Sequence, residues 1–208
     1  RLNSRTDWRR LHSFIGLVMV VPLLFFLLSG LSWTNVWGGK LTQAWSSVPG
    51  TRFVAPVAEE THASMNHGSM QHVPWTLEQT PMPLSGPATE TPRELNLDEV
   101  SRIASEQGFA NFRVHLPSAE QGVWTISATT MAGDLNAPLL ERTMHLDRHT
   151  GAVLADIRFA DYPLMGKAMA AGIPLHQGEL GLWNLLLNLF LCALVLLMIL
   201  AGVMMWWK

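Results

Sequence analysis

Two histidines stand beside the two longest apolar runs of the sequence, and they are the first candidates for chemistry. His12 precedes the charge-free run Phe14–Leu31, and His176 precedes a second charge-free run, Leu180–Trp207. A neutral imidazole is a good axial ligand for haem iron, and on an apolar helix it can hold a porphyrin inside a membrane. The alternative is an interfacial histidine that binds no ligand. We therefore take His12 and His176 as candidate haem ligands.

A second group of possible ligands lies in the stretch THASMNHGSMQH, which has the spacing H-x2-M-x-H-x2-M-x-H. Thioether and imidazole together suit copper, because methionine selects Cu(I) and histidine also serves Cu(II). Zinc fits less well, since no cysteine or acidic side chain joins the group. The alternative is a polar loop with incidental histidines. The five candidate metal ligands are His62, Met65, His67, Met70 and His72.

Three further histidines, His115, His145 and His149, fall in or beside expected strands. We interpret all three as structural, and His145 and His149 need not meet the Met/His-rich insert. No nucleophile with a paired base, glycine-rich phosphate loop or HExxH motif occurs in the sequence. Nothing in the sequence therefore predicts a hydrolase.

Composition places these residues in a membrane protein. The chain has 208 residues, of which 49% are hydrophobic and only 14% are charged, against about 25% charged in soluble domains. A net charge of −2 leaves no nucleic-acid footprint. The single cysteine, Cys192, lies inside an apolar run and cannot form an intrachain disulfide.

Each apolar run is long enough to cross a bilayer. Leu180–Trp207 would span about 42 Å as a helix, more than the roughly 30 Å of the hydrocarbon core. A signal peptide is the alternative for the first run, but that run ends in tryptophans rather than in a small-residue cleavage site. The basic residues before it place the N-terminus in the cytoplasm, so the long region between the runs should lie outside.

The chain divides into six parts on these grounds. We expect a cytoplasmic basic segment (1–12), a transmembrane helix (13–37), an extracytoplasmic linker with the Met/His-rich insert (38–93), an α+β domain (94–160), an interfacial helix and loop (161–179) and a second transmembrane helix (180–207). Residues 46–92 have few large apolar side chains, which predicts a flexible loop. Within 94–160 the pattern predicts one helix, capped by Asn96 or Asp98, and four antiparallel strands.

The sequence resembles the PepSY-associated transmembrane family, which includes iron-regulated membrane proteins and ferric-siderophore reductases. The resemblance rests on the stretches WRRLHSFIGL, SGLSWTNVWG, RTMHLDRHTGAVL, GIPLHQGELG and AGVMMWWK. It implies an α+β membrane protein in which two transmembrane helices flank an extracytoplasmic PepSY-like domain, a helix with an antiparallel sheet. Proteins of this kind carry four such helices and two PepSY domains, so this chain looks like the C-terminal half of one.

The same resemblance implies a function and its cofactor. It predicts a haem-b reductase in the bacterial inner membrane that passes electrons to a periplasmic metal substrate, a ferric siderophore or copper. His12 and His176 would each need a partner ligand from the missing N-terminal half or from a second subunit, because a full membrane crossing separates them. The alternatives are a non-enzymatic PepSY module that binds or regulates another protein, and a periplasmic copper-binding membrane protein.

Overall fold

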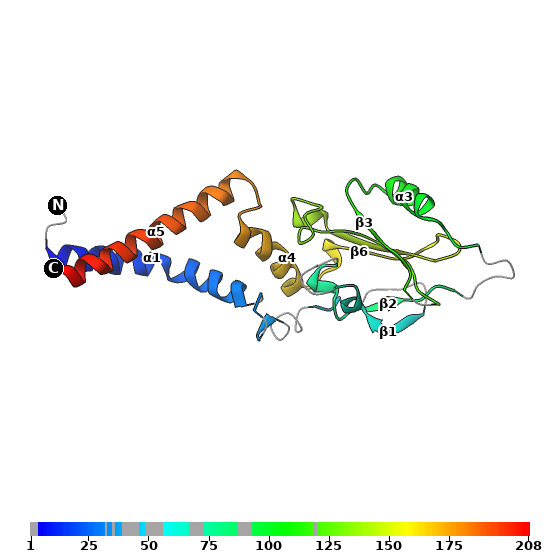
Figure 1. Cartoon of the computed structure of the whole chain (residues 1–208), viewed down its shortest axis with the longest axis horizontal. Coiled ribbons are helices and arrows are strands. Elements are labelled where there is room, and N and C mark those ends of the chain that lie inside the picture. Colours follow the sequence, from blue (N-terminus) through cyan, green and yellow to red (C-terminus); the bar gives the residue numbers. More distant parts are fainter. Residues whose placement is uncertain are drawn as a thin grey trace. The chain divides into compact units, whose positions relative to one another are not determined.

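The computed structural model describes residues 4–31, 33–34, 36–38, 46–48, 56–66, 73–86, 93–118 and 120–208. The chain forms two compact units: Arg1–Gly38 together with Leu175–Lys208, and Gly39–Pro174. The first unit contains two long helices, and the second contains an antiparallel sheet with its covering elements (Figure 1). The predicted fold class, an α+β membrane protein with an apolar helix at each end of a central domain, is confirmed.

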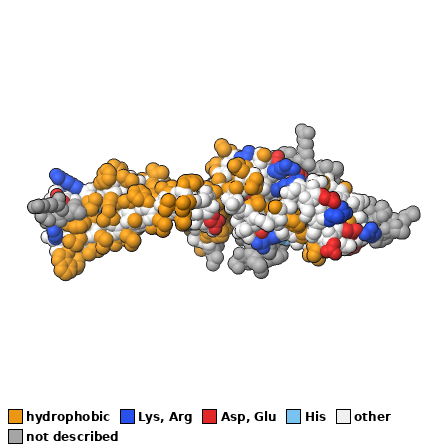
Figure 2. All heavy atoms as spheres, turned by 90° about the horizontal axis from the view of Figure 1, so that it is seen from above, with side chains coloured by type: hydrophobic (Ala, Val, Ile, Leu, Met, Phe, Trp, Pro, Cys, Tyr) orange, Lys and Arg blue, Asp and Glu red, His pale blue; other side chains and the backbone are white. Residues whose placement is uncertain are grey.

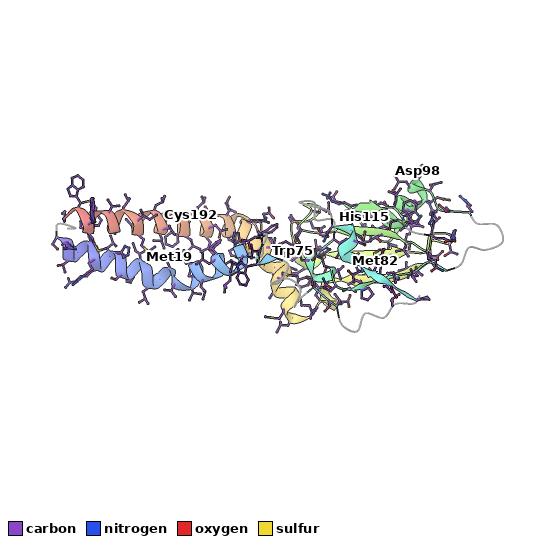
Figure 3. All side chains as sticks on the ribbon, turned by 60° about the horizontal axis from the view of Figure 1, so that its bottom comes forward. Met19, Trp75, Met82, Asp98, His115 and Cys192 are labelled. Carbon is purple, nitrogen blue, oxygen red and sulfur yellow. The ribbon has the colours of Figure 1, made fainter. Side chains whose placement is uncertain are left out.

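Helices α1 (Arg5–Leu31) and α5 (Leu182–Trp207) pack against each other, and each is long and apolar enough to cross a bilayer. α1 buries Ile15 and Met19, four residues apart and therefore on one face. Figure 3 labels Met19 on this helix. Most other large apolar side chains of the pair are exposed, and Figure 2 shows them covering its visible surface. This is the surface expected of helices that face lipid.

α1 begins earlier than predicted because its first turn is capped. Ser4 Oγ accepts a hydrogen bond from the Asp7 amide at 3.1 Å, and the Asp7 carboxylate accepts one from the Ser4 amide at 3.0 Å. This reciprocal pair is a capping box. The basic segment predicted as residues 1–12 is therefore, from Arg5 onward, the first two turns of the helix. α1 also ends at Leu31, short of the predicted boundary at residue 37.

The second unit is built on a four-stranded antiparallel sheet in the order β3-β4-β5-β6. The strands are β3 (Arg113–His115), β4 (Trp124–Ala128), β5 (Arg142–Leu146) and β6 (Val153–Arg158). All four strands were predicted from the sequence.

Helix α3 (Leu97–Glu106) covers one face of this sheet. The Asn96 side chain accepts from the Glu99 amide at 2.9 Å, and the Glu99 carboxylate accepts from the Asn96 amide at 3.1 Å. This capping box fixes the predicted start of the helix. The apolar core beneath α3 comprises Val100, Ala104, Phe109, Trp124, Ile126, Ala128, Met144 and Leu146.

The opposite face of the sheet is covered by residues 56–66 and 73–86. This segment, called the covering stretch below, belongs to the region that we predicted to be a flexible linker. Strand β1 (Val57–Thr61) pairs antiparallel with β2 (Pro81–Pro83), and two short 3-10 helices, η1 (His62–Met65) and η2 (Trp75–Leu77), lie between them in the sequence. Figure 1 shows β1 and β2 on the side of the sheet away from α3. For these described residues the flexible-loop prediction is wrong.

A second apolar core explains why this covering stretch folds. Its few large apolar residues, among them Val73 and Leu77, pack with Ile157 of the sheet and with Tyr162. Val73 and Leu77 are fully buried. Residues 46–92 are polar on average, and the prediction of a flexible loop rested on that average. It therefore missed the few apolar side chains that pack on the sheet.

Helix α4 (Leu164–Gln177) is the helix predicted within residues 161–179. It packs closely on η2, because a Cβ built at Gly166 would lie 2.6 Å from Thr76 Cγ2. That distance is shorter than real Cβ contacts allow, so a larger residue at position 166 would force Thr76 or α4 to shift. Two further short 3-10 helices, η3 (Pro138–Leu140) and η4 (Phe159–Asp161), flank β5 and β6.

Candidate functional site

His12 lies on α1 with its ring against the backbone of α5. Its Nδ1 is 2.9 Å from the carbonyl oxygen of Met198. A carbonyl can only accept, so Nδ1 carries the proton and donates it. Gly202 of α5 lies beside the ring, since a Cβ built there would be in van der Waals contact with it, 3.7 Å from both Cε1 and Nδ1 of His12. The neutral ring therefore keeps its lone pair on Nε2.

His176, in the last turn of α4, is held in the same way by α1. Its Nδ1 is 2.7 Å from Ser29 Oγ, and the Ser29 hydroxyl is 2.7 Å from the carbonyl oxygen of Phe25. Because that hydroxyl donates to the Phe25 carbonyl, Ser29 Oγ accepts from His176 Nδ1. The Phe26 ring packs edge-on at a centroid distance of 4.9 Å. The lone pair of neutral His176 is again on Nε2.

The two imidazoles mark opposite ends of the helix pair. His12 and Ser29 belong to one continuous helix, and at 1.5 Å per residue they are about 25 Å apart along its axis. Since Ser29 holds His176, the two rings are too far apart to ligate one iron. The separation predicted from the sequence is therefore present in the helix pair.

Two asparagines of α5 fix the turn that carries His176. Asn184 is fully buried and donates to the carbonyl oxygen of Leu175 at 3.0 Å. Asn188 donates to the carbonyl oxygen of His176 at 3.1 Å. These carbonyls are among the last of α4, which have no partner inside their own helix. The asparagines supply those partners and so hold the backbone of His176 in place.

Replacing Asn184 and Asn188 together with leucine is expected to destabilise the helix pair by about 1–3 kcal/mol. The reason is that each side-chain hydrogen bond between helices in a membrane contributes about 0.6 to 1.7 kcal/mol. The measurement is SDS-induced unfolding of the full chain in mixed micelles. Cys192→Leu, at an exposed position of the same helix, is the control that should unfold like the parent. Equal unfolding midpoints for all three proteins would contradict the positioning role.

An open pocket lies at the end of the helix pair near His12. It is lined by Arg5, Thr6, Arg9, Gly202, Met205 and Trp206. Its volume is about 560 Å³, within the roughly 300–1,000 Å³ of small-molecule sites. Arg5, Arg9 and His12 follow one another at helical spacing, so they share a face of α1. The pocket thus combines two guanidinium groups with an adjacent imidazole.

In the sheet unit, a row of side chains crosses the face away from α3. Cross-strand pairing aligns His115 with Thr125, and Thr125 with His145. The covering stretch adds His62, whose Nε2 lies 2.9 Å from His145 Nε2. His62 and His145 are both fully buried. A histidine of the predicted insert therefore does meet a histidine of the sheet, in contrast to our prediction that they need not.

Hydrogen-bond partners fix the protons of this buried pair. His62 Nδ1 is 2.6 Å from the carbonyl oxygen of Thr80, so this nitrogen donates. His62 Nε2 must then accept, and His145 Nε2 donates to it. His145 Nδ1 in turn accepts from the Thr125 hydroxyl at 2.8 Å. The result is a directed chain of four groups in which both imidazoles are neutral.

Burial keeps the pair neutral. Desolvation lowers the pKa of His62 to about 4, although its bond to the Thr80 carbonyl acts in the opposite direction. Desolvation, followed by the charges that His62 and His115 would carry, lowers the pKa of His145 well below 6.5. A proton added to His62 would set two N–H groups against each other across the 2.9 Å contact. One added to His145 would face the Thr125 hydroxyl, which now donates to that nitrogen.

A groove of about 180 Å³ reaches Thr125, the residue that bonds His145. Thr125 lines it together with Met65 of η1 and Met82 of β2. Figure 3 labels Met82. The exposed carboxylates of Glu59 and Glu60 also line it. The groove therefore combines two thioethers and two carboxylates with the threonine that bonds the buried His145.

A family model described as the PepSY-associated TM region matches residues 1–208, the whole chain. The chain belongs to this family. Neither a curated protein nor a solved structure matches it. The resemblance predicted from the sequence is thus confirmed, and with it a membrane protein carrying a PepSY-like domain.

In this PepSY-associated protein, the predicted site residues lie in different parts of the structure. His12 and His176 lie at opposite ends of the helix pair, each with Nε2 left as the acceptor nitrogen. His62 and Met65 lie on one 3-10 turn in the sheet unit. The remaining three predicted ligands, His67, Met70 and His72, lie outside the described residues.

Several residues that form these sites were not predicted from the sequence. Asn184 and Asn188 had a usable signal, because amides four residues apart in an apolar membrane helix indicate a polar contact between helices. No sequence signal pointed to the role of His145, because only the fold brings it to His62, which is 83 residues away in the sequence. Met82 also lies outside the insert motif, on a strand that the sequence did not predict.

Proposed function

We propose that this protein is a haem-b reductase of the bacterial inner membrane, passing electrons across the bilayer to a metal substrate in the periplasm. The observation that supports the proposal is that His12 and His176 have the same hydrogen-bonding pattern. In each ring Nδ1 donates to a partner on the helix pair, which leaves the Nε2 lone pair free to bind a metal. Histidines that bind metals are commonly oriented by such a second hydrogen bond.

The residues around His12 fit haem b. The neighbouring pocket has the volume of a small-molecule site, and its wall contains Arg5 and Arg9. Guanidinium groups pair well with carboxylates, so these arginines would hold the propionates of the porphyrin. When bound, haem supplies one-electron transfer through its iron. The protein supplies the axial imidazole, its orientation and the charge that balances the propionates.

Two haem positions, one toward each face of the membrane, account for the separation of the two histidines. His12 would serve the cytoplasmic side and His176 the periplasmic side. Each iron would take its other ligand from a second subunit or from a further segment of a longer chain. The sheet unit would then lie in the periplasm, where it would hold the metal substrate, a ferric siderophore or copper.

The experiment that tests this function is an absorption spectrum. Full-length protein purified from haem-replete cells is expected to show a Soret band, and sharp α and β bands after reduction by dithionite. Reoxidation of these bands by a ferric siderophore or by Cu(II) would identify the metal substrate. A colourless preparation from haem-replete cells would refute the proposal and favour a non-enzymatic PepSY module.

A further inference from the structure

The buried His62–His145 contact has the geometry of a metal site that holds a proton in place of the metal. The two Nε2 atoms face each other at 2.9 Å, and the hydrogen between them is the only atom that their separation accommodates. Both opposite nitrogens are already bonded, to Thr80 and to Thr125. Each imidazole is thus oriented by a hydrogen bond at its Nδ1, as metal-binding imidazoles commonly are.

Replacing the shared hydrogen with a metal ion needs no new charged group in the protein. The His145 proton moves from Nε2 to Nδ1, and Nδ1 then donates to the Thr125 hydroxyl oxygen, which accepts as readily as it donates. Both imidazoles stay neutral, and each presents an Nε2 lone pair. The separation between the two nitrogens must widen toward an upper limit of about 4 Å, which two metal–nitrogen bonds of about 2 Å reach only in a linear arrangement. No proton leaves the site.

The surrounding donors select a soft ion. Met65 follows His62 by three residues in a 3-10 turn, where side chains three apart lie on the same side. Met65 and Met82 line the same groove as Thr125, the partner of His145. Among the described residues, no group of three or more His, Cys, Asp or Glu side chains converges as a metal site. Two imidazoles with thioethers are the ligands of Cu(I) rather than of a hard dication.

Charge favours the same ion. A monovalent cation costs less to bury than a divalent one, and both imidazoles are fully buried. Glu59 and Glu60 at the groove attract a cation toward it without entering the buried pair. We propose that His62, His145 and Met65, with Met82 in the wall of the groove, form a Cu(I) site. The site deepens the proposed function, on which its role rests, because one-electron reduction of Cu(II) gives Cu(I).

This site differs from the metal site that the insert motif predicts. It keeps the first two residues of the motif, His62 and Met65, and adds His145 from β5 and Met82 from β2. His67, Met70 and His72 take no part in it. A variant that replaces those three residues with alanine therefore separates the two sites, and Cys192→Ala removes the one thiol that would compete for Cu(I).

The test measures Cu(I) binding to the full chain in detergent, in a background with His67, Met70 and His72 replaced by alanine and with Cys192→Ala. Competition against a chromogenic Cu(I) chelator under anaerobic conditions gives the stoichiometry and the dissociation constant. The background protein is expected to bind one Cu(I). Adding Met65→Leu and Met82→Leu should weaken the binding at least tenfold, because leucine keeps the apolar volume and removes the sulfur.

Two controls make the result decisive. Met144→Leu changes a buried methionine on the other face of the sheet and should leave the affinity unchanged, and near-ultraviolet circular dichroism verifies the fold of every variant. Loss of binding in the background protein, or equal affinity with and without Met65 and Met82, overturns the proposal. The Soret band of the same preparations reports separately on haem, so a colourless protein that binds Cu(I) refutes the reductase and retains the site.

Discussion

Replacing His12 with alanine is expected to remove about half of the haem bound by the purified protein, and replacing His176 to remove the other half. The reason is distance: about 25 Å of helix separates the two positions, so neither imidazole can substitute for the other. The double variant should be nearly colourless. The measurement is haem content per protein by the pyridine haemochromogen method, alongside the reduced-minus-oxidised spectrum.

His149→Ala serves as the control for this experiment, because His149 lies in the turn between β5 and β6 of the other unit. It should keep the haem content of the parent. Full haem content in the His12→Ala protein would show that His12 is not an axial ligand. A complete loss in either single variant would instead indicate one shared site, which the geometry of α1 opposes.

Acid is expected to open the contact between the covering stretch and the sheet. The pKa of His62 is about 4 in the folded chain and 6.5 when it is exposed, so the unfolded state binds more protons between these values. The free energy of opening therefore falls as the pH falls from about 6.5 to about 4. For His62 alone the loss at pH 4 is about 3 kcal/mol. His145, whose pKa is lowered too, adds to it.

Hydrogen–deuterium exchange of β5 and η1 amides, corrected for intrinsic rates, measures this loss. Protection should drop by about 100-fold or more between pH 7 and pH 4. Burial raises the pKa of Glu78 and of Glu141, so their protonation opposes the loss at the acidic end. His145→Gln should reduce the slope of protection against pH, whereas His149→Gln should not. Protection that stays constant across this range would contradict the neutral imidazole pair.

Much of the sheet unit could be predicted because its signals are local. The alternation of Val114 and its neighbours predicts a half-buried strand, and Asn96, one of the two predicted caps, marks the start of α3. The long apolar runs likewise predict α1 and α5 from composition alone. The boundaries were less accurate, because the cap at Ser4 extends α1 into a stretch whose arginines suggested a separate segment.

The covering stretch was mispredicted because its stability is not local. Its strands are short, and β2 has proline at both ends, which argues against a strand in isolation. What orders it is docking on a sheet face that carries Ile157 and the buried row through Thr125 and His145. The positions of His12 and His176 were visible in the sequence, whereas the protonated nitrogen of each ring depends on Met198 and Ser29, which only the fold brings near.

The distance in sequence between His62 and His145 also sets an order of events during synthesis. At about 5–20 residues per second, the separation of 83 positions between them delays the arrival of the partner strand by roughly 4–17 seconds. Throughout that interval Val73 and Leu77 have no sheet to pack on, since Ile157 emerges later still. Closure of the unit is thus a late, non-local step, of the kind that folds slowly and leaves apolar surface open to aggregation.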